Sequence, residues 1–202
     1  MKLATHHQAK GLGRLKTPIK ERYLSHEEIR QLLDASSGDL KDMIIVALGM
    51  GMRASEVLGL DRDQVDLKNA VVKLKDAKNG DRRLVLLPPR VVATLQQRPA
   101  PLRELFPEWP LDKLMHTVQR VAKRAGLQGV TFHTLRHTFA SHAVMAGVDL
   151  YTLAKILGHR DLAQVQRYAH LALPICKPLR IWPLRRFLQG TCHKICRTGS
   201  GL

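Results

Sequence analysis

The stretch from residue 131 to residue 170 constrains the fold of this chain more than any other part of the sequence. It reads TFHTLRHTFASHAVMAGVDLYTLAKILGHRDLAQVQRYAH, and its apolar residues recur at helical spacing. Gly147 and Gly158 are suited to end two successive helices, the second of which begins at Leu150. Four polar residues lie within this mainly apolar stretch: His133, Arg136, His159 and Tyr168. A packed core of this kind can direct several polar side chains to one point, as a functional site requires.

His133 and Arg136 lie three positions apart, so they project from the same face of the expected helix, within reach of one ligand. The imidazole can titrate near neutral pH, whereas the guanidinium stays cationic and presents a planar set of donors that suits phosphate oxygens. His159 directly follows the second helix, and Tyr168 comes nine positions later. Taken singly, each of these residues is more often an ordinary part of a packed core.

The charge of the chain indicates its partner. It has 33 lysine and arginine residues against 17 aspartate and glutamate residues, a formal net charge of +16 in 202 residues. Such a surplus favours a polyanion, either nucleic acid or an anionic membrane surface. The chain does not open with a pattern typical of a signal peptide, and no apolar run approaches the ~20 residues of a membrane span. We therefore expect nucleic acid as the partner and no membrane association.

The cysteines occur only near the C-terminus, at Cys176, Cys192 and Cys196. The main part of the chain therefore uses no disulfide, which is typical of proteins of the reducing cytoplasm. Cys192, His193 and Cys196 form one short cluster without a second pair of ligands, so no metal site is expected there.

The N-terminal part predicts an arm followed by two helices. Residues 1–20 are basic and lack apolar periodicity, which is typical of an arm or linker. Ser25 and Glu28 have the spacing of a capping box ahead of apolar residues at helical spacing. Residues 39–51 form an apolar run too short to cross a bilayer, which predicts a buried helix leading to Arg53.

The middle of the chain changes from helical to alternating periodicity. Residues 70–75 and 82–87 predict two strands, and Asn79 followed by Gly80 is a strong hairpin signal between them. Lys78 is therefore expected at the hairpin tip. A short helix is predicted over residues 91–97. An amphipathic helix is predicted over residues 111–126, with a basic face suited equally to DNA and to solvent.

The segments GMRASE, HTLRH, LGHRD and QRYAH, in this order, resemble the catalytic domain of the tyrosine recombinases, or phage-type integrases. The segment KNGDRRLVLLP, which lies between the first two, resembles the hairpin that carries an active-site lysine in that family. The resemblance covers roughly residues 23–170. It implies an α+β, mainly α fold, in which a helical catalytic domain carries a small antiparallel sheet at one edge, as in DNA breaking-rejoining enzymes.

The resemblance also implies roles for individual residues. Arg53 and Arg136 contact the scissile phosphate, Glu56 supports the geometry of the site, and His159 donates to a non-bridging oxygen. Tyr168 is the nucleophile, with His133 as the candidate base, and its attack gives a 3′-phosphotyrosyl DNA intermediate. Lys78 protonates the departing 5′ oxygen, and Lys75 is the alternative candidate for this role. Neither ATP nor a metal is required. His137 and His142 match no catalytic element, and we interpret them as packing residues.

The expected partners follow from the same resemblance. They are double-stranded DNA, three further recombinase subunits in a tetramer on DNA, and DNA-bending accessory proteins, in a cytoplasmic, nucleoid-associated location. The expected division is an arm or linker over residues 1–20, the catalytic domain over residues 21–172, and an atypical basic tail over residues 173–202 whose composition is compatible with disorder. Because the family's N-terminal DNA-clamping domain has no counterpart in this sequence, a truncated or inactive DNA-binding module is the alternative function.

Overall fold

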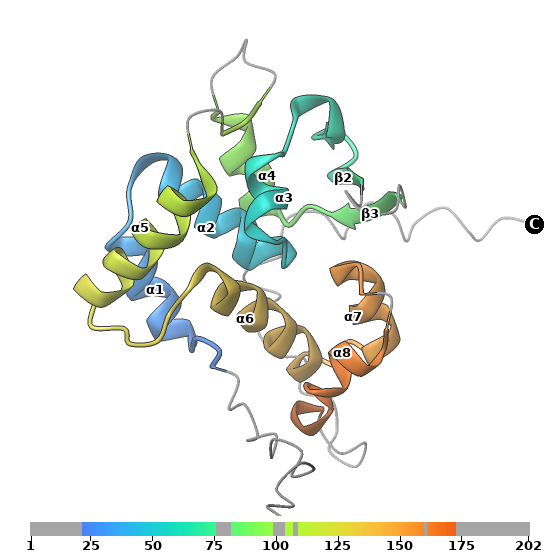
Figure 1. The fold of residues 1–202 in the computed structure, drawn as a ribbon. Helices are drawn as coiled ribbons and strands as arrows, with labels where there is room; N and C mark the ends of the chain where they lie inside the picture. Colours follow the sequence, from blue (N-terminus) through green and yellow to red (C-terminus); the bar gives the residue numbers. More distant parts are fainter. Residues whose placement is uncertain (1–21, 76–81, 99–103, 107–108, 160, 173–202) are drawn as a thin grey trace, which may run out of the picture.

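The computed structural model describes residues 22–75, 82–98, 104–106, 109–159 and 161–172. The predicted arm, the hairpin tip with Lys78 and the basic tail lie outside the described residues. The described helices, shown in Figure 1, are α1 (His26–Asp34), α2 (Gly38–Met50), α3 (Ala54–Leu58), α4 (Pro89–Gln96), α5 (Leu111–Arg124), α6 (Phe132–Met145), α7 (Leu150–Leu157) and α8 (Ala163–Gln166). Single 3-10 turns lie at Arg62–Gln64 and Ala169–Leu171. In the described part of the chain, no helix has the length and apolarity needed to cross a membrane.

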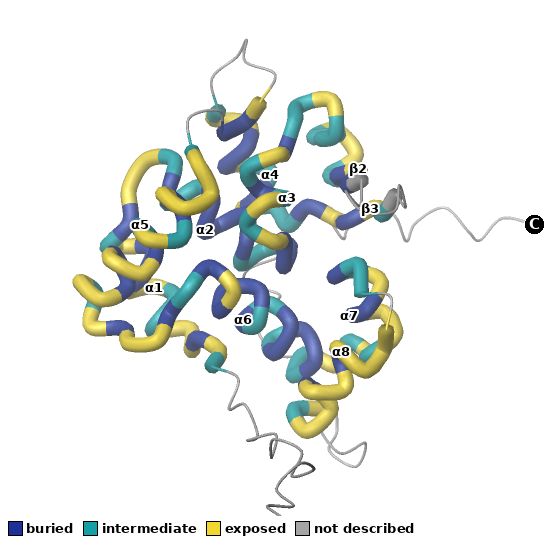
Figure 2. Tube along the Cα trace, viewed as in Figure 1, coloured by how far each residue is buried: buried dark blue, intermediate teal, exposed yellow. Residues whose placement is uncertain are grey.

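The first two helices follow the sequence prediction closely. Ser25 accepts a hydrogen bond from the Glu28 amide at 3.2 Å, and the Glu28 carboxylate accepts from the Ser25 amide at 2.9 Å, so the capping box is confirmed. Most of α2 is buried, as its continuous apolar run predicts (Figure 2). The helix ends at Met50 and is capped by Gly51, two residues before Arg53.

The sheet has three antiparallel strands in the order β1 (Val65–Asp66), β2 (Val71–Lys75) and β3 (Arg82–Leu86). Val71 pairs with Leu86 and Lys75 pairs with Arg82, which confirms the two predicted hairpin strands. The residues alternate between the two faces of β3, because Val85 is buried whereas Leu84 and Leu86 are exposed. Arg83 shares the inward-facing register of Val85, which directs it toward the helices.

Buried apolar residues form two clusters. The larger one contains residues of α1 to α5, the sheet and the first half of α6. The smaller one contains residues of the second half of α6 together with α7, α8 and Tyr168. Helix α6 packs on α2 and on α7, and thus belongs to both clusters (Figure 1). Its middle residues therefore lie where the two parts of the protein meet. The fold is mainly helical with a small antiparallel sheet, as expected.

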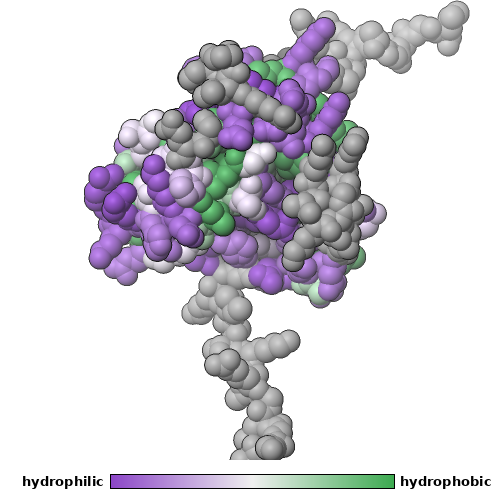
Figure 3. Space-filling model, turned by 45° about the horizontal axis from the view of Figure 1, so that its top comes forward, coloured by the Kyte–Doolittle hydropathy of each residue, from purple (hydrophilic) through white to green (hydrophobic). Residues whose placement is uncertain are grey.

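The predicted amphipathic helix corresponds to α5. Leu114, Val118, Val121 and Ala122 are buried, whereas the basic residues of its outer face are exposed: Lys113, Arg120, Lys123 and Arg124. Hydrophilic residues cover much of the described surface in Figure 3, with a band of apolar residues between them.

Candidate active site

Arg136 lies at the centre of the candidate site, although only 3% of its surface is exposed. Its Nη1 donates to the carbonyl of Gly51 at 2.9 Å, and its Nη2 donates to the carbonyl of Leu157 at 2.8 Å. These carbonyls lie at the C-terminal ends of α2 and α7, where backbone acceptors lack helical partners and the helix dipole favours a cation. The guanidinium of α6 therefore joins three helices at one point.

Two glycines allow the chain to pass close to this point. Gly51 has a left-handed φ of 65°, and a Cβ there would lie 2.4 Å from Phe139 and 2.8 Å from Leu157. Gly158 has a φ of 67°, and its Cβ would lie 2.3 Å from Nη1 of Arg83. Both positions thus need glycine for its backbone conformation and for space.

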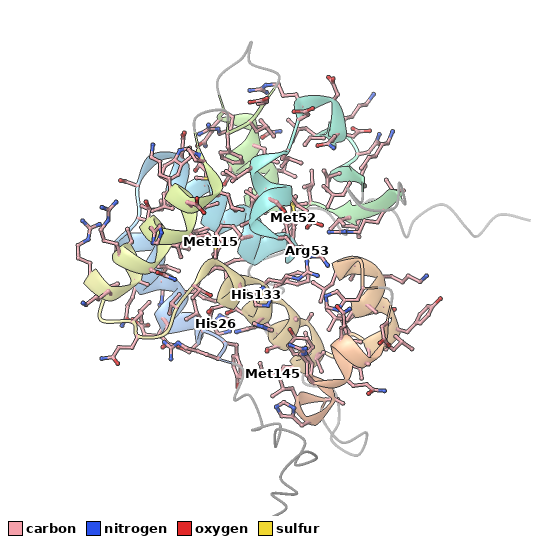
Figure 4. The ribbon with its side chains drawn as sticks, in the orientation of Figure 1. His26, Met52, Arg53, Met115, His133 and Met145 are labelled. Atoms are coloured by element: carbon pink, nitrogen blue, oxygen red, sulfur yellow. The ribbon has the colours of Figure 1, made fainter. Side chains whose placement is uncertain are left out.

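Glu56 accepts hydrogen bonds from the two other arginines of the site. Arg83 donates from Nη2 to both carboxylate oxygens at 2.9 Å, and Arg53 donates from Nη1 at 3.1 Å and from its backbone amide at 2.8 Å. Nη1 of Arg136 lies 4.0 Å from the same carboxylate. Figure 4 shows Arg53 at the start of α3, facing the region of α6 and α7. One carboxylate thus accepts from two guanidinium groups and lies beside a third, while the supporting role of Glu56 stays a prediction.

Burial and the charges of Arg53 and Arg83 lower the pKa of Arg136 to about 10, although Glu56 opposes this shift. Arg136 therefore remains cationic at neutral pH. The three arginines and one carboxylate leave an excess of positive charge in a partly enclosed region. Such an excess favours an anionic ligand, since like charges held together are otherwise unfavourable.

His159 completes the surroundings of Arg136. Its Nε2 lies 2.7 Å from Nη2 of Arg136. Because arginine has only donors, Nε2 must accept, and a neutral ring then carries its proton on Nδ1. Nδ1 is buried and has no hydrogen-bond partner among the described residues. Burial, followed by the charge of Arg136, lowers the pKa of His159 to about 4, so the ring is neutral at neutral pH.

Tyr168 lies between α8 and the last 3-10 turn and has 3% of its surface exposed. Its hydroxyl shares a hydrogen bond of 2.5 Å with Nδ1 of His137. The family resemblance predicts His133 as the base, and His137 is expected to be a packing residue. His133 is exposed near the start of α6, and its ring packs edge-on against His137 with 4.3 Å between the centroids (Figure 4). The structure thus brings His137, rather than His133, into a hydrogen bond with the tyrosine hydroxyl.

The model of the phage integrase family matches residues 22–104 and 109–173 of this chain. The chain belongs to the phage integrase family. A tyrosine recombinase XerA from Saccharolobus solfataricus is 30% identical over 153 residues, which cover 74% of this chain and 52% of that protein. The integrase of Escherichia phage P2 is 32% identical over 167 residues, covering 82% of this chain and 48% of that protein. The chain therefore spans about half the length of these relatives.

Solved structures agree with the assignment to the phage integrase family. The crystal structure of XerA recombinase matches with a TM-score of 0.65 and 28% sequence identity, over 74% of this chain and 59% of that chain. The catalytic domain of bacteriophage HP1 integrase matches with a TM-score of 0.63 and 28% identity, over 75% of this chain and 88% of that domain. The family and fold that the sequence motifs indicated are thus confirmed.

In this phage integrase family member, the structure brings together Arg53, Glu56, Arg136 and His159 through direct contacts. Lys78 lies outside the described residues, and the backbone of Lys75 ends β2 next to the undescribed tip. Within the described ranges, no three histidine, cysteine, aspartate or glutamate side chains are placed to hold a metal ion. The cluster of Cys192 to Cys196 lies outside those ranges.

Two residues that contact the candidate site, Arg83 and His137, were not predicted as site residues from the sequence. Arg83 is a charged residue at an inward-facing position of a strand, and the alternation along β3 could have identified it. His137 lies four positions after His133, so the two share one helical face. The helical spacing could therefore have indicated that His137 lies beside His133. It could not have shown which of the two histidines contacts Tyr168.

Proposed function

We propose that this chain carries the cleavage and rejoining activity of a site-specific DNA recombinase, through a 3′-phosphotyrosyl intermediate. The cationic site around Arg136 is the main support for this proposal. Three arginines converge on a single carboxylate, and the buried Nδ1 proton of His159 lacks a partner among the described residues. A phosphodiester supplies both the negative charge and the acceptor oxygens that this arrangement favours.

Arg53 and Arg136 would hold the scissile phosphate. In-line attack gathers negative charge on the two non-bridging oxygens, and guanidinium groups stabilise that charge in the transition state. Arginines in comparable roles contribute roughly 10³ to 10⁵ in rate. Glu56 would hold Arg53 in place through its two hydrogen bonds, and His159 would donate to a non-bridging oxygen.

Tyr168 would supply the nucleophile. Its hydroxyl loses a proton to a histidine base, for which the family resemblance indicates His133, and its oxygen forms a bond to phosphorus. The bond from phosphorus to the 5′ oxygen breaks, and that oxygen takes a proton from a general acid. The resemblance assigns this acid to Lys78, with Lys75 as the alternative. A 5′ hydroxyl of another strand reverses these steps and reseals the DNA, so no ATP or metal takes part.

The natural partner would be double-stranded DNA, with four recombinase subunits assembled on it and accessory proteins that bend it, in the cytoplasm and associated with the nucleoid. The net charge of +16 supports a DNA partner. Two neighbours of known structure are described as XerH recombinase bound to its difH substrate, which is consistent with this proposal. Their sequence identities of 23% and 24% support the fold alone.

A nicked suicide DNA substrate tests the proposed reaction. Cleavage next to the nick releases a short oligonucleotide and traps the protein as a covalent adduct, which denaturing gel electrophoresis detects. Because the natural site is unknown, the substrates should include a pool of random duplexes. We expect an adduct with the parent chain and none with Tyr168→Phe. If both proteins bind DNA and neither forms an adduct, the chain is an inactive DNA-binding module.

Salt dependence tests the binding of DNA by this chain alone. Because contacts to phosphates release counterions, affinity falls steeply as the salt concentration rises. We expect weak binding with a strong salt dependence in gel-shift titrations. Tight binding that does not respond to salt would contradict the electrostatic interface proposed here.

A further inference from the structure

We infer that His137 is the catalytic residue that accepts the proton of Tyr168, in place of His133. The inference rests on the proposed function and specifies the base that the cleavage step uses. It starts from the hydrogen bond of 2.5 Å between Nδ1 of His137 and the Tyr168 hydroxyl. The sequence motifs of the family point to His133, and only the folded arrangement points to the residue one turn further along α6.

The geometry suits proton transfer. A general base must lie within hydrogen-bond reach of the proton it removes, at about 2.6–3.2 Å or closer. His137 meets this requirement before DNA binds. The centroid of its ring lies 5.8 Å from that of the Tyr168 ring, and the His133 ring packs edge-on against the His137 ring with 4.3 Å between the centroids. His133 would then orient the imidazole of His137 rather than remove the proton itself.

The charges around His137 keep it ready to accept a proton. Burial, the guanidinium of Arg167 and that of Arg136 lower the pKa of His137, so the ring is neutral near pH 7. The titratable and charged groups that face it in the described structure are His133, Arg136, Arg167 and Tyr168. A neutral ring with its proton on Nε2 offers Nδ1 as the acceptor for the tyrosine hydroxyl.

DNA binding would make His137 a stronger base. A phosphodiester held by Arg136 brings a negative charge beside that guanidinium and offsets its effect on the imidazole. The proton then moves from the Tyr168 oxygen to Nδ1 as that oxygen bonds to phosphorus. When the strand is resealed, the proton returns from Nδ1 to the released tyrosine oxygen. The proton that His137 takes during cleavage is the one it returns during resealing, so no further reactant is needed.

The decisive experiment measures single-turnover adduct formation on two suicide substrates. One has the natural 5′ oxygen at the scissile position, and the other has sulfur there, because a thiolate leaves without a general acid. We expect His137→Gln to slow adduct formation by about 10² to 10⁴ on both substrates, since removal of a general base has that effect. Lys78→Ala is the matched control, and sulfur should restore its rate if it supplies the leaving-group proton.

The pH profile separates a base from a residue that only supports the fold. In His137→Gln, we expect the remaining rate to rise with pH up to the alkaline limit, because hydroxide replaces the missing base. We expect His133→Gln to keep the parent profile and to lose less than His137→Gln. Equal rates and profiles for His137→Gln and the parent would overturn the inference. A larger defect in His133→Gln, with a profile that rises with pH, would return the role to His133.

Two checks keep these outcomes interpretable. DNA binding and thermal unfolding of each variant show whether the protein still folds. An adduct with the parent chain shows that the proposed reaction occurs, so an unaffected His137→Gln would then contradict only the assignment of the base. If the parent forms no adduct, the proposed function itself fails. Nitrogen-15 NMR gives a readout without cleavage: Nδ1 of His137 should be unprotonated in the parent, and its resonance should shift in Tyr168→Phe.

Discussion

Arg83 donates to both carboxylate oxygens of Glu56 from a single guanidinium nitrogen, at 2.9 Å each, although the two residues are 27 positions apart in the chain. This contact connects the sheet to α3 at the edge of the candidate active site. The same carboxylate accepts from Arg53, so the position of this candidate site arginine depends on a residue of β3. The sheet therefore contributes to the site even without its hairpin tip.

The first prediction concerns this connection. We expect Arg83→Met to lower the free energy of unfolding by about 1–3 kcal/mol, because a largely buried carboxylate loses two charged hydrogen bonds. We also expect slower adduct formation, since Arg53 is then held less firmly. Urea denaturation and the suicide-substrate assay measure the two effects.

Arg30 provides the control for Arg83. It forms an ion pair with Glu27 on the surface, and 72% of its side chain is exposed. Exposed pairs typically contribute about 0.2–1 kcal/mol, so Arg30→Met should change stability little and leave cleavage unchanged. Equal effects of the two substitutions would argue against a special role for Arg83.

The second prediction separates the structural and chemical roles of Arg136. Its planar fork reaches two helix ends and His159 at once, and the single ammonium group of a lysine cannot span them. We expect Arg136→Lys to reduce stability by roughly 2–4 kcal/mol, because buried carbonyls lose their partners, and to reduce cleavage by about 10³ or more. Thermal unfolding and single-turnover cleavage measure these changes.

Arg53→Lys is the matched comparison for Arg136→Lys. The Arg53 side chain is 42% exposed, so Arg53→Lys should slow cleavage with a change in stability below about 1 kcal/mol. The site model would be wrong if Arg136→Lys folded and cleaved like the parent chain.

The third prediction concerns the pH dependence of stability at His159. The pKa of its imidazole is lowered from 6.5 to about 4 in the folded protein, chiefly by burial and then by Arg136. Between these values the unfolded chain binds a proton that the folded chain excludes. The contribution of the neutral His159 imidazole to the free energy of unfolding is therefore fully present above the unfolded pKa. The free energy of unfolding then falls as the pH falls toward the folded pKa.

His159→Gln tests this pH dependence because it removes the titrating group. Any loss of stability caused by the substitution should be largest at roughly pH 7.5 and should shrink toward roughly pH 4.5, as judged from urea midpoints. Other histidines titrate equally in both proteins, so they cancel in the difference. A gap that stayed constant over this range would mean that the folded and unfolded pKa values of His159 are similar.

Local signals predicted the elements of this fold well, because they depend on residues close in sequence. Helix α1 begins after the capping box at Ser25, and α7 ends before Gly158, both where expected. The alternation of β2 and β3 likewise followed from neighbouring residues. The contacts of the site have a different origin: Arg136 meets the Gly51 carbonyl across 85 positions, and Tyr168 meets His137 across 31. Only the packing of α6 between two clusters determines them, so residue spacing alone could not show that the tyrosine hydroxyl meets His137.

The last prediction concerns the segment that enters the domain ahead of α1. The Leu24 amide donates to Thr138 Oγ1 at 2.9 Å, and the Leu24 carbonyl lies 2.7 Å from Nε2 of His142. Because a carbonyl only accepts, Nε2 of His142 carries the proton, which supports the interpretation of His142 as a structural residue. Leu24 is thus fixed by its own backbone to the helix that carries Arg136 and His137.

Thr138→Val keeps the shape of the side chain but leaves the buried Leu24 amide without its acceptor. We expect a loss of about 1–3 kcal/mol in the free energy of unfolding and faster hydrogen exchange at the Leu24 amide. Thr138→Ser retains the hydroxyl and should preserve the slow exchange, although it loses a methyl group. If the valine and serine variants exchanged at the same rate, the hydrogen bond to Thr138 would not be what holds the segment. The two variants differ only in the side chain at residue 138. If only the valine variant exchanged faster and its cleavage also slowed, the segment ahead of α1 would be coupled to α6 through the hydrogen bond between the Leu24 amide and residue 138.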